Sequence, residues 1–210
     1  MRKRSYLAIA LLALAVLMGT GFASAGIVRP TFGGFGQTLR WQPDVLTPAE
    51  VAGAAYCKQT GGQVEVRHPV FGTNGSSAQQ LVLAGHAVFC QYTAKDTSRI
   101  HILVTTLNAT MPTLAALAYY AKVPTSNATC PGGANPASCY CTYLGGSDQF
   151  GGATLAGGAW VLKGAIDEDL EACIFPDLSS IDSWGLAYHA NNIVRGINLA
   201  TVLRYKNPHR

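Results

Sequence analysis

The sequence predicts an α+β fold built from two copies of a small helix-strands-helix module, each clamped by a disulfide bond. The motif Tyr-Cys-x-x-x-Gly-Gly occurs at Tyr56–Gly62 and again at Tyr140–Gly146. Each motif cysteine is followed by the next cysteine at nearly the same distance, Cys90 after Cys57 and Cys173 after Cys141. Helix-start and strand patterns surround both motifs in the same order, as expected of an internal repeat.

A shorter similarity marks the end of each copy. Leu117–Ala121 resembles Leu186–Ala190, and these two segments are closer together in the sequence than the two Tyr-Cys motifs are. We therefore expect extra residues in the first copy and place them at 99–107. The predicted organisation of the chain follows from these limits. It consists of a signal peptide at 1–25, a loosely ordered Gly- and Pro-rich arm at 26–46, a first module at 47–124, a linker at 125–134, and a second module with a C-terminal extension at 135–210.

The first copy is expected to open with a helix. Thr47 is a favourable N-cap and Pro48 a favourable first helical residue, and the Gly61–Gly62 pair can close the last turn in a left-handed conformation. Alternation of polar and apolar residues predicts a strand over 63–67. The remaining elements are strands over 81–93 and 99–104 and a helix over 112–122.

The second copy is expected to follow the same plan. Asn135 and Pro136 open a helix that ends at Gly145–Gly146. The remaining elements are strands over 159–162 and 172–175 and a helix over 180–191. The apolar tail 193–205 predicts a final strand or an amphipathic helix that packs on the core.

The N-terminus has the pattern of a cleavable secretory signal. Arg2–Arg4 are basic, residues 6–18 are apolar, and Ala23–Ala25 give a cleavage site of the A-x-A type, so Gly26 is the expected mature N-terminus. The apolar stretch is shorter than the roughly 20 residues of a spanning helix, and an uncleaved N-terminal anchor is the alternative. Cleavage lowers the formal net charge from +4 to about +1, which argues against nucleic acid as a partner. We expect a secreted or periplasmic protein with no transmembrane span after cleavage.

Six cysteines lie in the mature part, and this even number predicts three disulfide bonds in an oxidising compartment. In each copy, a cysteine on the first helix can clamp that helix to a strand. The expected pairs are Cys57–Cys90, Cys141–Cys173 and Cys130–Cys139. Shuffled pairings such as Cys130 with Cys141 stay open, because sequence alone does not choose among them. The spacing of Cys139 and Cys141 is unlike that of structural zinc sites, so no metal is expected.

The second copy resembles a known family. Residues Asn135–Gly146 read Asn-Pro-Ala-Ser-x-Tyr-Cys-x-x-x-Gly-Gly, and Cys173–Asp177 read Cys-Ile-Phe-Pro-Asp, followed by a serine pair and Trp184. These features are similar to those of a small exported bacterial domain of unknown function that is often labelled a hemolysin. The similarity is clear over 135–190 and faint over 47–93.

This resemblance implies export, a small α+β module and disulfide bonds, and it brings no catalytic residues with it. Two residues depart from the family's pattern. Leu178 stands where the family has glycine, and Ile181 stands where it has a further cysteine. The bridge that this further cysteine makes in the family is therefore absent from the chain.

No catalytic motif stands out. The histidines lie in none of the spacings typical of metal sites, and we interpret His86 and His101, in predicted strands, as hydrogen-bonded structural residues. The sequence has no Gly-x-Ser-x-Gly motif, and all six cysteines have a use as bridges. The acidic cluster 167–171 offers oxygen ligands for Ca²⁺ but lacks the spacing of a calcium loop, so we interpret it as a solvated loop. No cofactor is expected.

These observations favour an exported, non-enzymatic binding module of unknown ligand, inhibitor-like or associated with the envelope. Its expected partner is a protein or an envelope component. A secreted enzyme of unrecognised type is the alternative, and a membrane-active toxin, as the family label suggests, is a weaker one. The candidate contact residues are Phe175, Pro176 and Asp177, in a turn with Leu178, together with Trp160 and Phe150. Aromatic residues dominate many interfaces, but Phe175 and Trp160 can equally fill the core between helix and sheet.

Overall fold

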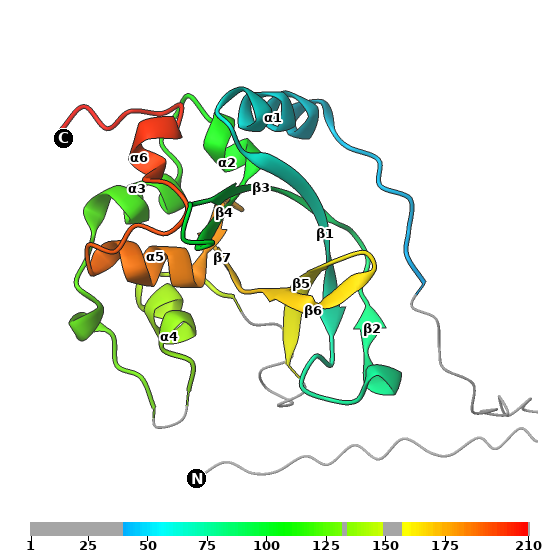
Figure 1. The fold of residues 1–210 in the computed structure, drawn as a ribbon. Helices are drawn as coiled ribbons and strands as arrows, with labels where there is room; N and C mark the ends of the chain where they lie inside the picture. Colours follow the sequence, from blue (N-terminus) through cyan, green and yellow to red (C-terminus); the bar gives the residue numbers. More distant parts are fainter. Residues whose placement is uncertain (1–39, 132–133, 149–156, 210) are drawn as a thin grey trace, which may run out of the picture. The chain divides into compact units, whose positions relative to one another are not determined.

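The computed structural model describes residues 40–131, 134–148 and 157–209. The predicted signal peptide, its cleavage site and most of the arm lie outside these residues, and so does Phe150. The predicted mixture of helices and strands is confirmed, and the strands are antiparallel (Figure 1). No helix within the described ranges is long and apolar enough to cross a membrane.

The elements alternate along the chain. The helices are α1 (Pro48–Gln59), α2 (Val104–Asn108), α3 (Leu114–Ala121), α4 (Pro136–Tyr143), α5 (Ser183–Ala190) and α6 (Leu199–Val202), with short 3₁₀ turns η1 (Ser77–Gln79) and η2 (Thr125–Asn127). The strands are β1 (Gln63–Phe71), β2 (Leu81–Val82), β3 (Ala87–Thr93), β4 (Arg99–Leu103), β5 (Gly158–Leu162), β6 (Ala165–Leu170), β7 (Ala172–Ile174) and β8 (Ser180–Asp182).

The described strands belong to one sheet. Its order is β6-β5-β1-β3-β4-β8-β7, and the short β2 pairs with the end of β1. Strand β5 pairs with β1 along Arg67–Phe71, so a hairpin from the predicted second module extends the strands of the first. The two predicted modules therefore share a single sheet.

Both predicted helix starts and both Gly-Gly ends are confirmed. A capping box between Thr47 and Glu50 opens α1, and the side chain of Asn135 accepts the N–H of Ala137 at the start of α4. After α1, Gly61 has a φ of 86°, and after α4, Gly145 has a φ of 88°. These left-handed residues close the last helical turns at a position that favours glycine.

The second glycine of each pair has a different role, which is to leave room for a disulfide bond. A Cβ at Gly62 would collide with the sulfur of Cys90, and a Cβ at Gly146 would lie 2.5 Å from the sulfur of Cys173. The motif Tyr-Cys-x-x-x-Gly-Gly thus contains a bridged cysteine, a left-handed glycine, and a glycine that the bridge packs against.

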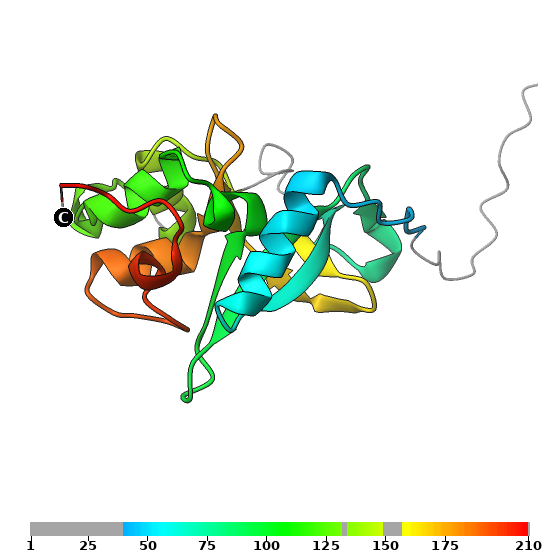
Figure 2. The ribbon, with the colours of Figure 1, turned by 90° about the horizontal axis from the view of Figure 1, so that it is seen from above.

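One face of the sheet is apolar and packs against helices. Alternate residues of β3 and β4 point to this face, and Val88, Cys90, Ile100 and Ile102 are all buried there. The same cluster includes residues of each of the six described helices. Figure 2 shows α1 lying beside the strands of the first half of the chain.

Three disulfide bonds reinforce this packing. The bonded pairs are Cys57–Cys90, Cys141–Cys173 and Cys130–Cys139, as predicted. The first two join a helix to a strand, α1 to β3 and α4 to β7. Closing a loop of this length stabilises a fold by about 3–4 kcal/mol in the chain-entropy model. Such bridges are typical of an oxidising, extracellular or periplasmic environment.

A row of four residues runs across β3, β4, β8 and β7. Cys90 of β3 lies opposite Ile102 of β4, and Ile102 lies opposite Ile181 of β8. Ile181 in turn lies opposite Cys173 of β7. Read from either end, the row therefore has a cysteine, an isoleucine, an isoleucine and a cysteine.

The register next to each bridge is also the same. Gln63, which follows the first Gly-Gly pair, lies opposite Gln91, which follows Cys90. Ser147, which follows the second Gly-Gly pair, forms an antiparallel bridge with Ile174, which follows Cys173. In addition, α1 packs on α2 and α4 packs on α5.

Several predicted elements differ from the structure. The predicted strand 81–93 is divided into β2 and β3, because Gly85 adopts a φ of 95° between them. The acidic cluster 167–171 is not a loop, since most of it forms β6. The predicted helix 180–191 begins as β8 and only then becomes α5.

Two further predictions concern the ends of the copies. The stretch 99–107, expected to hold extra residues, forms β4 and part of α2 in the centre of the fold. In the tail 193–205, α6 is a single short helix, and Leu199 and Leu203 are fully buried in the main core. The prediction that this tail packs on the core is therefore confirmed.

Candidate functional site

The second face of the sheet carries charged and polar side chains. Glu65 and Arg67 of β1, Gln91 of β3 and His101 of β4 occupy strand positions that alternate with the apolar ones. All four residues are buried, with exposed fractions between 2% and 8%. Charged side chains are rarely buried to this extent unless they are paired, so their partners decide what this face can do.

The sheet curls around this polar face. Glu168 of β6 lies 3.4 Å from Arg99 of β4, measured from Oε2 to Nη1. In a flat sheet these strands would be about 19 Å apart, because four spacings of about 4.8 Å separate them. Arg67 also spans the curl, since its Nη1 donates to the backbone oxygens of Trp160 at 3.1 Å and Glu168 at 2.8 Å. Figure 1 shows β5 and β6 turned towards the viewer below β1.

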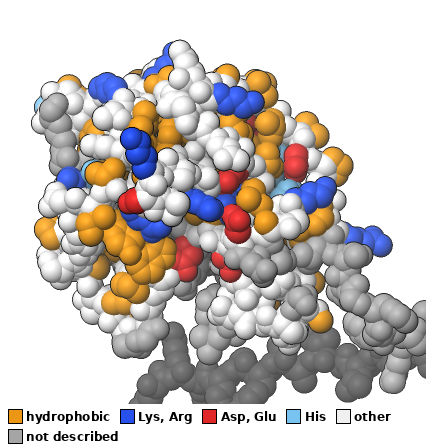
Figure 3. Space-filling view, viewed as in Figure 1, with side chains coloured by type: hydrophobic (Ala, Val, Ile, Leu, Met, Phe, Trp, Pro, Cys, Tyr) orange, Lys and Arg blue, Asp and Glu red, His pale blue; other side chains and the backbone are white. Residues whose placement is uncertain are grey.

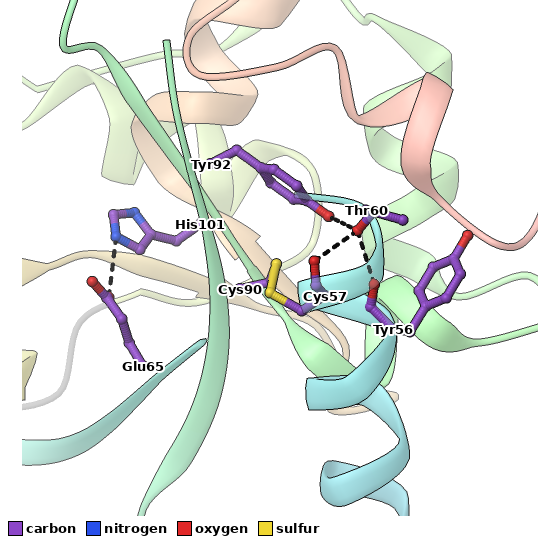
Figure 4. Close-up of a disulfide and its surroundings, with 7 residues drawn as sticks. All are labelled: Tyr56, Cys57, Thr60, Glu65, Cys90, Tyr92 and His101. Carbon is purple, nitrogen blue, oxygen red and sulfur yellow. Dashed lines mark hydrogen bonds and ion pairs between the residues drawn. A yellow bond between two sulfur atoms is a disulfide. The ribbon is translucent and has the colours of Figure 1, made fainter. Parts of the chain in front are cut away.

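Buried Glu65 is the centre of a hydrogen-bonded network. Its Oε2 accepts a hydrogen bond from Nε of Arg67 at 2.8 Å and lies 3.4 Å from Nε2 of His101. The same ring nitrogen is 3.0 Å from Oε1 of Gln91. Figure 4 shows Glu65 facing His101, with the disulfide bond of Cys90 on the other side of the strands. Burial raises the pKa of Glu65, but His101 and Arg67 outweigh it and hold the pKa below its ordinary value.

Asp182 completes the network from β8. Its Oδ2 accepts the backbone N–H of His101 at 2.7 Å, and its Oδ1 accepts the N–H of Gly185 as the N-cap of α5. Nδ1 of His101 lies 3.9 Å from Oδ2. Burial raises the pKa of Asp182 above its ordinary value, against the lowering effect of His101. The imidazole of His101 therefore has a carboxyl group on each side.

A cleft of about 390 Å³ opens beside this network. Its volume is within the range of about 300–1,000 Å³ that is typical of small-molecule sites. Besides His101 and Asp182, its charged lining residues are Arg67, Arg99, Arg195, Glu168, Asp169 and Glu171. Trp184, at the start of α5, adds an aromatic ring. On the face seen in Figure 3, acidic and basic side chains lie next to one another beside a hydrophobic area.

Glu171 connects the cleft to α4. Nδ2 of Asn135 donates to both of its carboxylate oxygens, at 2.7 and 2.6 Å. Oδ1 of the same asparagine accepts the N–H of Ala137 at 2.9 Å, so one amide caps a helix and positions a carboxyl group of the cleft. Burial raises the pKa of Glu171, and the nearby Asp148 raises it further, while Asn135 acts in the opposite sense.

None of the predicted contact residues that the structure describes lines the cleft. The ring of Phe175 is in the main core, with only 3% of the residue exposed, so it cannot offer its ring to a partner. The prediction of a contact role for Phe175 is therefore wrong, and the alternative core interpretation holds. Trp160 packs edge-on against Phe89, with ring centroids 6.1 Å apart. Pro176 and Asp177 are exposed.

The turn after Phe175 instead supports α3. Oδ2 of Asp177 accepts the N–H of Leu114 at 2.8 Å, and Oγ of Ser179 accepts the N–H of Ala115 at 2.9 Å. These are the first N–H groups of the helix, which have no partner within the helix itself. In Figure 2 this turn is the orange loop that projects beside the green helices. The Phe-Pro-Asp segment thus has a structural role in this chain.

Sequence reasoning missed most of the cleft. His101 was interpreted as a hydrogen-bonded structural histidine, and it does hydrogen-bond to Gln91, but it also lines the cleft. A usable signal was present, because Glu65 and Arg67 alternate with valines in a strand whose apolar side is clearly the core. What the sequence did not reveal is that the sheet curls and buries this polar side.

The fold and the cleft define a disulfide-bonded α+β protein with a charged, concave site. Among the described residues, no group of three or more His, Cys, Asp or Glu side chains is arranged to hold a metal ion. No protein-family model matches the chain, and no curated protein or solved structure is detectably similar to it. The site is therefore interpreted from its own geometry.

Proposed function

We propose that this chain is an exported, disulfide-stabilised, non-enzymatic binding module, and that its ligand is a small polar component of the cell envelope that enters the cleft. The observation that carries the proposal is the burial of Glu65, Arg67 and His101 beside the cleft. Replacing buried ion pairs by apolar residues of similar volume is often neutral or stabilises a fold by about 1–4 kcal/mol. Buried charged groups therefore often add little to stability. Where such groups lie beside a cleft, they are candidates for a functional site.

The rigidity of the site supports binding. The walls of the cleft are largely strands, and disulfide bonds join two of the neighbouring helices to the sheet. Asp182 is fixed by two backbone N–H groups, and Glu171 is fixed by Asn135. Groups that are already ordered lose little conformational entropy when a ligand binds.

The proposed compartment rests on the signal pattern of residues 1–25 together with the disulfide bonds. Disulfide bonds form and persist where the surroundings are oxidising, as they are in the periplasm and outside the cell. The resemblance to the exported bacterial domain leads to the same compartment. It adds no activity, so the function is argued from the cleft alone.

We further propose that the chain arose by duplication of one module. The support is the shared register, in which Cys90 and Cys173 face Ile102 and Ile181 from opposite ends of one row. Helix packing is also shared by the two halves. The helix that contains the first bridged cysteine packs on a helix later in the same half, so that α1 packs on α2 and α4 packs on α5.

This register changes the proposed alignment of the two copies. Ile102 corresponds to Ile181, so α5 corresponds to α2 instead of α3. The extra residues of the first copy are then the segment from the end of α2 to the linker, and those of the second copy are the tail with α6. The similarity of Leu117–Ala121 to Leu186–Ala190 does not belong to this alignment.

A ligand titration tests the proposed function. The exported protein is labelled with ¹⁵N, and its NMR spectrum is followed during addition of a panel of sugars, sugar acids, amino acids and dipeptides. We expect at least one panel member to cause saturable shifts in the indole signal of Trp184 and the backbone signal of His101. The indole of Trp41, which packs on His68 outside the cleft, is the internal control and should not move.

The same spectra test the alternatives. Conversion of a panel member into a product would support a secreted enzyme and contradict a non-enzymatic module. Saturable shifts confined to residues outside the cleft would contradict the proposed site. Release of dye from lipid vesicles at low protein concentration would support the membrane-active alternative.

A further inference from the structure

Two arginines of the described chain stack on tyrosine rings, and they differ in their other contacts. Cζ of Arg204 lies 5.6 Å from the ring centroid of Tyr56, and its Nη1 donates to Oδ1 of Asn108 at 2.8 Å. Cζ of Arg195 lies 4.9 Å from the ring centroid of Tyr188. Within the described residues, the Arg195 guanidinium has no hydrogen bond and no carboxylate at ion-pair distance, and Asp96 and Asp182 act on it only at longer range. Arg195 also lines the cleft.

Close backbone packing places Arg195 at the start of β4. The next residue, Gly196, donates its N–H to Oγ of Ser98 at 3.2 Å. A Cβ at Gly196 would lie 2.9 Å from the backbone nitrogen of Ile100. Residues 98–100 and 195–196 are therefore neighbours, and Arg99 lines the same cleft as Arg195.

Arg99 is available to a ligand. Its contact with Glu168 is 3.4 Å long, and the two side chains are 47% and 49% exposed. Solvent and salt screen an ion pair of this kind, so it contributes little and a ligand can replace it. The cleft thus presents two guanidinium groups that an incoming anion can bind.

The remaining walls suit a ligand rich in hydroxyl groups. Glu168 is exposed on β6 and lines the cleft, and its carboxylate oxygens can accept hydrogen bonds. Trp184 offers an aromatic ring against which the C–H face of a sugar can pack. Glu171 and Asp182 also line the cleft, and burial raises the pKa of each above its ordinary value.

We propose that Arg99 and Arg195 bind the acidic group of an acidic sugar, that is, a hydroxyl-rich ring that carries one carboxylate or phosphate. The inference rests on the proposed binding function and names the class of its ligand. A guanidinium presents paired N–H donors that match two oxygens of a carboxylate or a phosphate. A neutral sugar of the same shape offers Arg195 only uncharged hydroxyl acceptors and binds more weakly.

Calorimetric titration of the exported protein with three probes tests this inference. The probes are glucuronate, glucose 6-phosphate and glucose, which share a ring and differ in the acidic group. We expect at least one acid to bind at least tenfold more tightly than glucose, and to bind more weakly as salt is added. The acid that binds more tightly distinguishes a carboxylate from a phosphate ligand.

Matched variants locate the acidic group. Arg195→Gln should lower the affinity for the preferred acid on the order of tenfold and leave any binding of glucose unchanged, and Arg195→Lys should restore part of the loss. Arg204→Gln removes an equally stacked arginine outside the cleft and should have no effect. Melting curves of all variants show that the fold is retained.

The outcomes separate this inference from the function on which it rests. Glucose binding in the cleft as tightly as both acids would overturn the acidic-sugar inference and leave the binding module intact. If none of the three probes binds, but an amino acid or dipeptide binds in the cleft, the acidic-sugar inference is likewise overturned and the binding module is left intact. An equal loss of acid binding in Arg195→Gln and Arg204→Gln would overturn the assigned arginines.

Discussion

Ile102 on β4 lies directly opposite Ile181 on β8, and this pair joins β4, the last strand of the first half, to β8 of the second half. Both isoleucines are fully buried. On its other side each lies opposite a disulfide cysteine, Cys90 or Cys173. The two helix-to-strand disulfide bonds and the contact between the halves therefore lie in one row. A change that displaces either bridge should affect the centre of the fold.

Gly146 provides the first test of this relationship. A Cβ there would lie 2.5 Å from the sulfur of Cys173 and 3.0 Å from that of Cys141. We expect Gly146→Ala to lower the free energy of unfolding by about 1–3 kcal/mol, the usual effect of overpacking a core. Urea denaturation under oxidising conditions measures the change.

Gly145→Ala is the matched control, because a methyl group there meets no atom within 4 Å and only the φ of 88° is unfavourable. That strain amounts to about 1–2 kcal/mol. Replacing Cys141 and Cys173 by serine should reduce the effect of Gly146→Ala and leave that of Gly145→Ala unchanged. Equal effects of Gly146→Ala with and without the bridge would contradict the packing argument.

Phe175 and Leu178, at the two ends of one turn, should respond in opposite ways to truncation. Phe175 fills the core, so Phe175→Ala should lower the free energy of unfolding by about 3–5 kcal/mol. Leu178 is 75% exposed and has a φ of 62°, so Leu178→Gly should relieve strain of about 1 kcal/mol and not lower stability. Thermal and urea denaturation of both variants check this. A large loss of stability in Leu178→Gly would show that its side chain has a structural contact.

Local sequence signals predicted the helix ends, the strands and the bridges, because each depends on residues close in the chain or on a countable set of cysteines. Thr47 and Asn135 cap their helices through residues two or three positions away. The split of the predicted strand 81–93 was missed, because nothing in an apolar run shows that Gly85 adopts a positive φ.

Asp177 should give the fold a defined pH dependence. Slight burial opposes it, but hydrogen bonds from Ser179 and the N–H of Leu114 lower the pKa of Asp177 below its ordinary value of 3.8. A lowered pKa in the folded state means that the charged form stabilises the fold above the unfolded pKa, and that this contribution is lost as pH falls through the folded pKa. We expect Asp177→Asn to lower the free energy of unfolding by about 0.5–1.5 kcal/mol near neutral pH, because the amide keeps one acceptor oxygen but loses the other, together with the charge.

The difference between Asp177→Asn and the parent should shrink as the pH falls below 3.8 and through the lowered pKa of the folded state, where the parent carboxyl group becomes protonated. Urea denaturation at several pH values measures it. Ser179→Ala removes a hydroxyl that donates to Asp177 and accepts from Ala115, and it should reduce the pH dependence in part. A difference that is constant from neutral to acid pH would show that the charge of Asp177 has no part in the effect.

The cleft could not be predicted, because it depends on contacts between residues far apart in the sequence. Arg67 meets the backbone of Glu168 only because β5 and β6 pair with β1 and curl over it. The acidic cluster 167–171 is polar enough to suggest a loop, and exposed acidic residues such as Glu168 and Asp169 are compatible with an edge strand as well. Local pattern does not distinguish these two cases.

Glu65 and Arg67 allow a test of whether the polar face serves folding or binding. Arg67→Met removes the guanidinium and leaves the Glu65 carboxylate buried. Breaking a buried pair in this way destabilises a fold by about 3–5 kcal/mol. We expect the lower end of this range, because His101 still faces the carboxylate. Urea denaturation near neutral pH measures the loss.

The double variant Glu65→Leu/Arg67→Met decides between the two roles, because it removes both charges and keeps similar side-chain volumes. Such replacements are often neutral or stabilising, so stability should return to within about 1 kcal/mol of the parent. If the charges are there for binding, this stable variant should no longer cause the Trp184 shifts with a ligand that binds the parent protein. A double variant as unstable as Arg67→Met alone would show that the network is needed for folding. A stable double variant that still binds the ligand would show that binding depends on other residues of the cleft and not on the charges of Glu65 and Arg67.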